Sequence, residues 1–460
     1  MAHVKPGPNS DEISQRLLPD NDVMSATAPA TQTATPTFSD AVATWARIGV
    51  TSFGGPAGQI AMMHRVLVDE KRWLDERTYL TALSFCTLLP GPEAMQLATY
   101  AGWRLHGLKG GLVAGLLFVL PGAAVILALS ILYALYGSLP VAAALFTGIK
   151  AAVLAIVLEA LLRISRRSLK DTAEWLIAAA AFLAIFFLHV PFPVIIFVAG
   201  LIGYLRGRNS VPEAVVSAPQ RAPVALADTA ATIAVWTAIW IAPLALVAIS
   251  YGPDHVLTKL GWFYSKLAVV TFGGAYAVLA YMAQDVVQYY GWLNAGEMLD
   301  GLGLAETTPG PLILVTEFVG FLAAYRSHAG GSIPMGVAGA LVTLWATFAP
   351  CFLWIFAGAP YIERIADMPR LKSALSAITA AVVGVILNLT VWFALHVIFR
   401  DVQETQYGPL YLSNPNLHSI DWSAAALAVL AGVLLFALHR GVITTLAICG
   451  GLGWLGSQLG

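Results

Sequence analysis

The chain has 460 residues, of which 58% are hydrophobic and only 11% charged, and its formal net charge is −1. Soluble domains carry about 25% charged residues, so the composition excludes an ordinary soluble protein and predicts an all-α polytopic membrane protein in a lipid bilayer. A net charge this close to zero indicates no charged partner, and we expect no nucleic-acid partner. Cys86, Cys351 and Cys449 lie in apolar segments at unrelated spacings, which predicts buried thiols rather than a disulfide framework or a metal site.

The chain begins with a polar stretch, 1–38, whose Ser, Thr, Pro, Ala and Asp content predicts a disordered cytoplasmic tail. Thirteen apolar segments follow, near 41–63, 78–103, 110–136, 140–162, 173–189, 190–205, 228–249, 256–283, 297–325, 331–357, 373–399, 422–438 and 441–459. Most are long enough to cross a core of about 30 Å. We expect a first repeat over 39–206, a linker over 207–227, a linking transmembrane helix over 228–250 and a second repeat over 251–460.

The two halves share motifs at one constant spacing. The matches at an offset of 219 residues are Phe53-Gly54-Gly55 with Phe272-Gly273-Gly274, Trp73-Leu74 with Trp292-Leu293, and Pro90-Gly91-Pro92 with Pro309-Gly310-Pro311. Three separate motifs at one offset indicate an internal repeat of about six apolar segments.

Two observations predict that the second repeat is inverted. Corresponding points of the two repeats are separated by seven segments, which are the six of one repeat and the linking helix. If all seven span the membrane, the second repeat has the opposite orientation. In addition, the loops 64–77 and 163–170 each hold four Lys or Arg residues, whereas their counterparts 284–296 and 400–421 hold none and one. Since short cytoplasmic loops collect Lys and Arg, this opposite bias indicates opposite orientation.

The basic loop 64–77 conflicts with six full spans, because it would lie outside if the segment 41–63 crossed the membrane. The conflict disappears if the first two segments of each repeat are re-entrant hairpins. Interrupted helices are tolerated at membrane depth where protein or a water-filled cavity covers them. We therefore favour four spans and two re-entrant hairpins per repeat over six spans.

The Pro-Gly-Pro motifs break apolar segments that otherwise resemble single helices, because proline lacks an N–H and clashes with the preceding turn. A half-helix begins after each break, and its free N–H groups and dipole form an anion site. Matching breaks in two halves are typical of a substrate site between repeats. The alternative is a pair of structural kinks. The residues that we expect at the substrate are Pro90, Gly91, Pro92, Gln96, Thr308, Pro309, Gly310 and Pro311.

The Gly-Gly pairs allow close backbone approach or a positive φ. They either form ordinary helix-packing contacts in the membrane or help to wrap the site, and their place beside the Pro-Gly-Pro breaks favours the second. The residues concerned are Phe53, Gly54, Gly55 and Pro56, then Phe272, Gly273 and Gly274.

Ionisable residues inside apolar segments are functional candidates. They are Arg47, Glu93, Lys150, Glu159, Lys266, Glu306 and Glu317. Glu93 either exchanges protons or complements the dipole of its helix, and Glu317 is a second candidate for proton coupling. Lys150 either supplies a cation to an anion path or forms a salt bridge with Glu159 or another helix.

The combination of Phe53-Gly54-Gly55-Pro56, Arg72-Trp73-Leu74, Leu89-Pro90-Gly91-Pro92 with Gln96, and Thr308-Pro309-Gly310-Pro311 resembles the chromate ion transporter family in its long, two-repeat form. The resemblance covers roughly 40–458. It implies efflux of chromate across the inner membrane of a bacterium, driven by the proton motive force, and chromate resistance. In the second copy Ala275 replaces proline and Leu312 replaces glutamate, so we expect a single proton-coupling carboxylate, Glu93.

We therefore expect a secondary active transporter that holds a tetrahedral dianion near Pro92 and Pro311. Chromate is the expected substrate, sulfate is a competing anion of similar size and charge, and protons are the coupling ion. The alternatives are a passive anion channel and a transporter of sulfate or another oxyanion. No nucleophile elbow, dinucleotide fingerprint or zinc motif is present in the sequence, so we expect neither an enzyme nor a bound cofactor.

Overall fold

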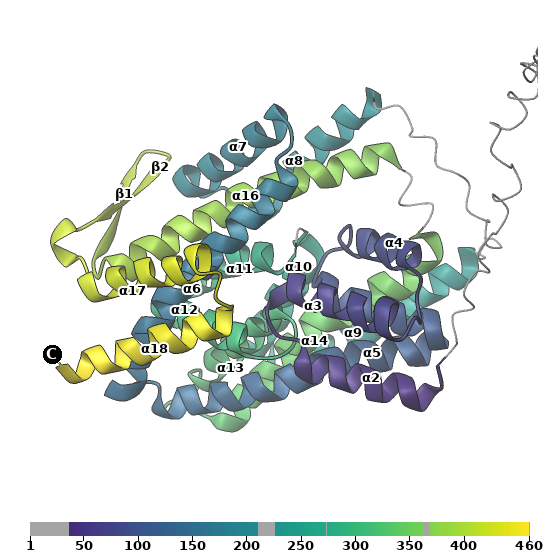
Figure 1. Ribbon diagram of the computed structural model, residues 1–460, viewed down its shortest axis with the longest axis horizontal. Coiled ribbons are helices and arrows are strands. Elements are labelled where there is room, and N and C mark those ends of the chain that lie inside the picture. The colour runs from purple at the N-terminus through teal and green to yellow at the C-terminus, as the bar shows by residue number, and fades with distance from the viewer. Residues whose placement is uncertain (1–35, 210–225, 273, 363–367, 460) are drawn as a thin grey trace, which may run out of the picture.

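The computed structural model describes residues 36–209, 226–272, 274–362 and 368–459. The chain is an all-α polytopic membrane protein with one added β-hairpin (Figure 1). Among these described residues, five helices are long and apolar enough to cross a membrane. The predicted tail, most of the linker and Gly273 lie outside the described residues.

The first repeat contains short helices that are interrupted at the motifs. Its elements are α2 (Phe38–Thr51), α3 (Gly55–His64), the π-helical turn η2 (Arg65–Glu70), α4 (Glu76–Cys86), α5 (Glu93–Tyr136), α6 (Pro140–Ser168), α7 (Thr172–Leu188), α8 (Phe192–Arg206) and the 3-10 turn η3 (Gly207–Asn209). α5 consists of two arms with a kink at His106 and Gly107. The apolar segments predicted at 41–63 and 78–103 are thus each divided into two helices.

The second repeat has the same order of elements. The linking helix α9 (Leu226–Tyr251) precedes α10 (Val256–Val270), α11 (Ala275–Gln284), the π-helical turn η4 (Asp285–Tyr289), α12 (Ala295–Thr307), the 3-10 turn η5 (Leu312–Leu314), α13 (Val315–Tyr325), α14 (Ile333–Gly358), the 3-10 turn η6 (Ala359–Tyr361), α16 (Pro369–Ile398), β1 (Val402–Tyr407), β2 (Leu410–Pro415), the 3-10 turn η7 (Leu417–Ser419), α17 (Trp422–Gly432), the π-helical turn η8 (Val433–Ala437) and α18 (Val442–Leu459).

The repeat extends to individual backbone hydrogen bonds. The N–H of Trp73 donates to the carbonyl of Leu67, and the N–H of Trp292 donates to the carbonyl of Val286. Both donors and both acceptors are 219 residues apart, and each bond closes the chain after a π-helical turn. Equivalent segments of the two halves therefore adopt the same local structure.

One pair of corresponding helices in the two repeats runs in opposite directions. The second arm of α5 packs against α14, its counterpart, with Gly111 beside Phe356 and Gly115 beside Phe352. Residue numbers that rise along one helix fall along the other, so the pair is antiparallel. An antiparallel pair of equivalent helices is the arrangement that inverted repeats produce.

The chain reverses direction at the second Phe-Gly-Gly motif. The ring of Phe263 on α10 lies 5.4 Å from that of Tyr290 and 5.7 Å from that of Trp292, measured between ring centroids. The Tyr264 hydroxyl also lies 3.4 Å from the sulfur of Met282 on α11. α10 and α11 therefore lie antiparallel, as a re-entrant hairpin requires. That this hairpin enters and leaves the bilayer on one side stays a prediction.

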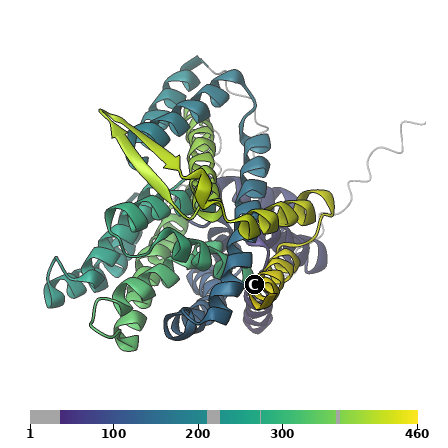
Figure 2. The same ribbon diagram turned by 90° about the vertical axis from the view of Figure 1, so that its left-hand side faces the viewer.

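The molecule has two distinct ends along its long axis. At one of them, which we call the basic end, Arg206 forms an ion pair with Asp171 at 3.1 Å and Arg370 lies over the ring of Tyr204. At the opposite end, the hairpin end, β1 and β2 project beside α7 (Figures 1 and 2). The positive-inside rule predicts that the basic end faces the cytoplasm.

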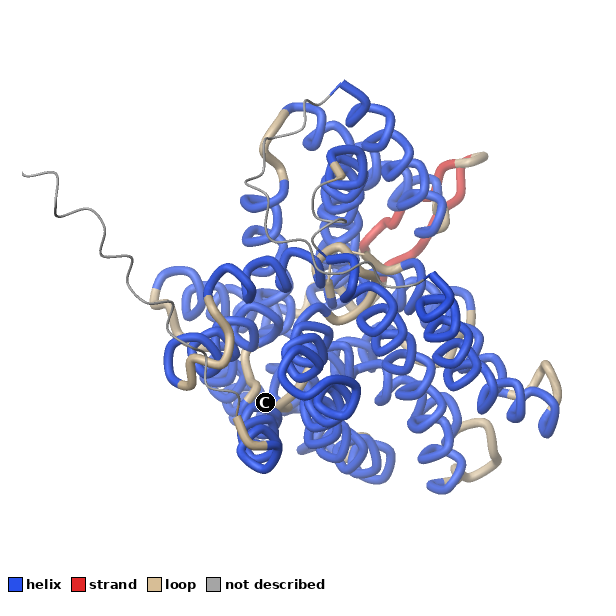
Figure 3. Tube along the Cα trace, turned by 90° about the vertical axis from the view of Figure 1, so that its right-hand side faces the viewer, coloured by secondary structure: helices blue, strands red, loops and turns tan. Residues whose placement is uncertain are grey.

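The β-hairpin belongs to the second repeat alone. β1 and β2 pair antiparallel from Val402 with Pro415 to Tyr407 with Leu410, and a bridge between Phe399 and Ile420 closes the base. In the first repeat the equivalent connection, between α6 and α7, is only residues 169–171. Figure 3 shows the strands at the edge of the helical body. This insertion, predicted only as a loop, makes the two ends of the repeats structurally unequal.

The apolar outer surface fits a lipid environment. On α9 the apolar side chains of Leu246 and Ile249 are 65% and 82% exposed. α9 is attached to α14 by a hydrogen bond of 3.0 Å from the Trp345 indole to the carbonyl of Trp240. A helix with so little of its surface covered by protein is stable where hydrocarbon covers the rest.

Candidate functional site

The four helix breaks meet at the interface of the two repeats and are connected by reciprocal hydrogen bonds. The N–H of Gly91 donates to the carbonyl of Thr271 at 3.1 Å, and the N–H of Gly310 donates to the carbonyl of Ser52 at 2.8 Å. Donors and acceptors are again 219 residues apart. Each Pro-Gly-Pro turn is thus bonded to the Phe-Gly-Gly break of the other repeat. These hydrogen bonds therefore run between unlike motifs of the two repeats, and we call the four bonded breaks the clamp.

Two glutamine side chains donate to the Pro-Gly-Pro turns, Gln59 across the repeats and Gln96 within the first repeat. The amide of Gln59 donates to the carbonyl of Gly310 at 2.6 Å, and that of Gln96 donates to the carbonyl of Pro90 at 2.7 Å. The other amide atom of each, Oε1, is buried and has no partner among the described residues. Buried acceptors without donors are uncommon and point to a functional role. Gln96 was predicted, whereas Gln59 was missed, although it is a lone amide in the apolar run of α3.

The central glycines of both turns have conformations that L side chains rarely adopt. Gly91 has φ +108° and Gly310 has φ +94°. A Cβ atom at Gly91 would lie 3.2 Å from both the sulfur of Cys351 and the amide nitrogen of Gln96. Glycine is therefore required at this turn by backbone conformation and by space.

Helices that begin at the breaks have no side-chain cap. This holds for α3, for α5, for α11 and for η5, which precedes α13. By contrast, α4 and α12, which end just before the Pro-Gly-Pro turns, are capped by Asp75 and Asn294. The first N–H groups of an uncapped helix point away from its body without partners. The breaks therefore bring together several positive helix ends without side-chain caps, which is the chemistry of an anion site.

Glu93 lies at the start of α11 of the other repeat. Its Oε1 is 3.7 Å from the position that a Cβ atom at Gly274 would occupy. A carboxylate at a helix N-terminus is favoured by the dipole, so Glu93 occupies a place where a substrate anion is also favoured. Its counterpart in the second repeat, Leu312, is apolar and buried. The two halves of the site are therefore chemically unequal.

Glu317 is isolated inside the protein. Its side chain belongs to α13 and is only 1% exposed, and its Oε2 has no hydrogen-bond partner among the described residues. The neighbouring Thr316 hydroxyl is also buried without a partner in the same part of the chain. A buried carboxyl oxygen without a hydrogen-bond partner makes the ionised form costly.

Lys150 pairs with another helix. Its ammonium lies 3.4 Å from Oδ1 of Asp300 on α12, and the Tyr133 hydroxyl donates to the other carboxylate oxygen at 2.8 Å. Glu159 pairs instead with Arg163 of its own helix. α12 continues for about 10 Å from Asp300 to the Pro-Gly-Pro turn, so the Lys150 pair lies away from the breaks. Asp300, an acidic residue in an apolar segment, was missed.

The remaining predicted residues lie around the clamp with different degrees of burial. Pro90, Pro92 and Pro311 are buried, and the Thr308 hydroxyl donates to the carbonyl of Leu304. Gly54 and Gly55 have positive φ, Pro56 lies in the first turn of α3, and Phe53 is 38% exposed. Phe272 and Pro309 are half-buried. Within the described ranges, no group of three His, Cys, Asp or Glu side chains is able to hold a metal ion.

Comparison with known proteins identifies the family. The family model described as Chromate transporter matches residues 39–204 and 258–454. The chain is 35% identical over 348 residues to the chromate transport protein of Pseudomonas aeruginosa, which covers 75% of this chain and 78% of that protein. It is 29% identical over 349 residues to the chromate transport protein of Cupriavidus metallidurans, with 76% and 80% covered.

An uncharacterized transporter of Methanocaldococcus jannaschii is 27% identical over 350 residues, which covers 76% of this chain and 82% of that protein. No solved structure matches the chain. The family match covers both repeats and includes all four breaks that form the clamp. The chain is therefore a member of the chromate transporter family.

Proposed function

We propose that this protein exports chromate from the cytoplasm across a bacterial inner membrane, driven by the proton motive force, and thereby confers chromate resistance. The observation that carries the proposal is the pair of reciprocal hydrogen bonds from Gly91 to Thr271 and from Gly310 to Ser52. Broken helices that meet between inverted repeats are the arrangement in which secondary transporters bind their substrates. The names of the family and of its relatives supply chromate as the substrate.

Substrate binding follows from the helix starts at the clamp. The uncapped starts of α5 and α11 offer backbone N–H donors and the positive ends of two dipoles. Such neutral donors suit a compact tetrahedral dianion, because they bind it without a fixed cation that would prevent its release. The N–H groups of Gly91 and Gly310 bond across the repeats. When one repeat rocks against the other, these bonds are replaced by bonds to the anion. The site then opens first to one side of the membrane and afterwards to the other.

Glu93 gives the site a dependence on protons. Its carboxylate lies where the dipole of α11 favours an anion, so it competes with chromate when ionised. Protonation removes its charge and permits the dianion to bind, so the proton leaves together with the dianion. The exported pair then carries a net charge of −1, and the membrane-potential component of the proton motive force drives its export. The alternative proton acceptor, in place of Glu93, is Glu317, which is buried and whose Oε2 has no hydrogen-bond partner in the described chain.

The membrane potential also acts on the substrate directly. Moving one elementary charge through the potential changes the free energy by about 2.3 kcal/mol per 100 mV. The export of a dianion from an inside-negative cell therefore lowers the free energy by about twice that amount. This component of the proton motive force favours export even before any proton is exchanged.

The test is uptake of radiolabelled chromate into inverted membrane vesicles, with and without an imposed proton gradient. We expect saturable uptake that the gradient accelerates and that external sulfate inhibits. Vesicles without the protein, and vesicles with an inactive Gly91 variant, are the controls. Uptake that does not saturate and ignores the gradient identifies a passive channel, and uptake of sulfate without chromate overturns the assigned substrate.

A further inference from the structure

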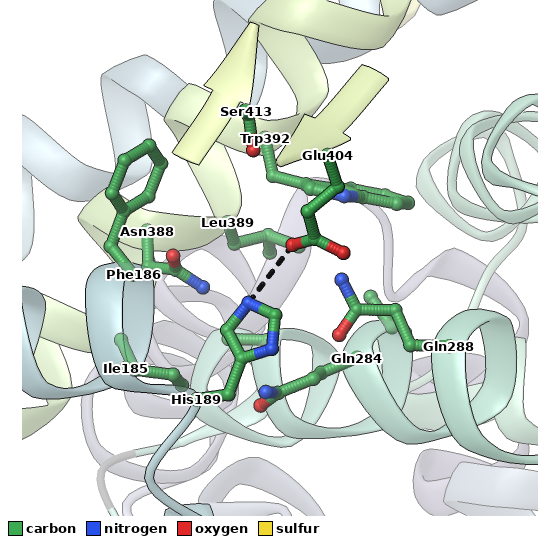
Figure 4. A pocket seen from close by; sticks show the side chains of 12 residues that line it. Ile185, Phe186, His189, Gln284, Gln288, Asn388, Leu389, Trp392, Glu404 and Ser413 are labelled. Carbon is green, nitrogen blue, oxygen red and sulfur yellow. Dashed lines mark ion pairs between the residues drawn. The ribbon is translucent and has the colours of Figure 1, made fainter. Parts of the chain in front are cut away.

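A small polar cavity lies at the hairpin end, between the first repeat and the second (Figure 4). Its volume is about 30 Å³, which is room for about one water molecule. The polar side chains that line it are His189, Gln284, Gln288, Asn388, Glu404 and Ser413. They come from the end of α7, from α11 and η4, from α16 and from both strands of the hairpin.

His189 is held in this cavity by the hairpin. Its Nε2 lies 3.1 Å from Oε1 of Glu404, and its ring stacks on Tyr411 with 4.0 Å between centroids and 9° between planes. The residue ends α7 in a left-handed conformation with φ +49°, which costs about 1–2 kcal/mol for an L-residue. The strained backbone and two contacts together fix the imidazole beneath the hairpin, and Figure 4 shows the pair at the centre of the cavity.

Three side-chain amides surround this pair. Those of Gln284, Gln288 and Asn388 have no hydrogen-bond partner elsewhere in the described protein. Figure 4 shows the amides of Gln288 and Asn388 on either side of the contact between His189 and Glu404. Each amide has two N–H donors. Among the residues that line the cavity, Glu404 is the acidic one. The nearby Asp285 forms an ion pair with Lys266 at 3.8 Å.

α11 connects this cavity with the clamp. The helix starts at Ala275, directly after the glycine beside the Glu93 carboxyl, and ends at Gln284 in the cavity lining. Its ten residues span about 15 Å. An anion that leaves the start of α11 on the hairpin side thus meets the cavity one helix length away.

We propose that this cavity is a release site for the transported tetrahedral oxyanion and that the hairpin is its cover. Glu404 pairs with the imidazole of His189 when no anion is present. Because the cavity has room for about one water, chromate or sulfate enters only when Glu404 leaves His189 and the hairpin moves outward. The amides, the Ser413 hydroxyl and His189 then donate to the oxyanion. This inference rests on the proposed export function and adds a second anion site to it.

The experiment uses inverted vesicles, whose lumen faces the hairpin end. The lumen is loaded with sulfate at a series of concentrations, and the initial rate of chromate uptake is measured. An occupied release site inhibits uptake from the lumenal side. We expect Asn388→Leu to raise the lumenal sulfate concentration for half-inhibition by about tenfold, the effect of one hydrogen bond to a charged group. We expect Glu404→Gln to lower it, because the competing carboxylate is removed.

The chromate concentration that half-saturates uptake from outside is expected to stay unchanged in both variants. Gln403→Ala, on the neighbouring exposed hairpin residue, is the matched control. If Asn388→Leu does not reach the membrane, Ser413→Ala carries the same comparison. If lumenal sulfate inhibits Glu404→Gln and the amide or hydroxyl variant as it inhibits the wild type, the release site is overturned. The proposed export function is not affected by that result, because the wild type still transports chromate. A wild-type protein that transports no chromate overturns the proposed function instead.

Discussion

The N–H of Gly91 donates a hydrogen bond of 3.1 Å to the carbonyl of Thr271, 180 positions later in the chain and in the other repeat. The matching bond from Gly310 to Ser52 makes this relationship reciprocal. Two bonds of this kind hold both Pro-Gly-Pro turns against the helix breaks of the opposite repeat. Any movement of one repeat against the other therefore changes the hydrogen bonding of both turns at once.

Gly91→Val is expected to abolish chromate transport. The residue has φ +108°, and an added Cβ would lie 3.2 Å from Cys351 and from Gln96. Strain of this kind costs about 1–3 kcal/mol, and the displaced turn loses its bond to Thr271. Transport into inverted vesicles is measured together with the amount of protein in the membrane. Gly451→Ala, on α18 with open space around it, is the control, and normal transport by Gly91→Val contradicts the clamp as the substrate site.

Glu93→Gln is expected to remove the pH dependence of transport. The wild-type rate should rise as the pH falls, because protonation of Glu93 clears the start of α11 for the anion. The amide is neutral at every pH, so the variant should show a flat profile. Initial rates of chromate uptake between pH 5 and pH 8 test this prediction. If Glu93→Gln shows the same pH profile as the wild type, Glu93 is not the coupling group. Glu317 is then the remaining candidate, and Glu317→Gln is the variant that tests it.

The positions of the breaks were predictable, because proline cannot continue a helix and repeated Gly-Gly pairs permit unusual backbone angles. The repeat offset also predicted which segments correspond. Which break bonds to which was not predictable. The hydrogen bonds at Gly91 and Gly310 use backbone atoms, which carry no sequence signal and meet only after the repeats have packed together.

Other parts of the site were hidden for different reasons. Asp300 lies outside the repeated motifs, although an acidic residue among apolar ones is a recognisable signal. The hairpin was predicted only as a loop. Its strands, from Val402 and from Leu410, have exposed and half-buried positions that follow no period of two, so they lack the strict alternation that half-buried strands show.

Acid is expected to loosen the base of the hairpin through Asp421. Burial alone would raise the pKa of this carboxyl, but hydrogen bonds from Ser423 and Ala424 and the Arg400 guanidinium outweigh it and hold the pKa at about 2. The depressed pKa contributes stability that is complete above the ordinary value of about 3.9 and is lost as the pH falls toward 2. Hydrogen exchange of 399–421 at pH 5 and pH 3 measures the change.

The control for this prediction is Asp421→Asn, which keeps the helix cap but cannot ionise. We expect its protection factors, which are exchange rates corrected for the intrinsic rate at each pH, to be equal at both pH values. Asp421→Ala should show lower protection factors at both, because a lost cap costs about 1 kcal/mol. Wild-type protection factors that do not differ between the two pH values would contradict the role of Asp421.

Cysteines placed at positions 70 and 289 are expected to face opposite sides of the membrane. Glu70 and Tyr289 end the equivalent π-helical turns η2 and η4, and both are exposed. An impermeant maleimide should label Glu70→Cys only in inverted vesicles and Tyr289→Cys only in right-side-out vesicles. The native cysteines are buried and are replaced by alanine as a background. Labelling of both positions from one side would rule out inversion.

The ion pair between Lys150 and Asp300 is expected to hold α6 against α12. Removing one partner of a buried pair leaves an uncompensated charge and costs about 3–5 kcal/mol. Lys150→Met should therefore lower the amount of folded protein in the membrane, because Asp300 is only 4% exposed. The double variant with Asp300→Asn should restore the amount and the transport rate, since the neutral amide keeps a partner for Tyr133. A double variant that is abundant but inactive would assign Lys150 to the anion path, because its loss then impairs transport without impairing folding.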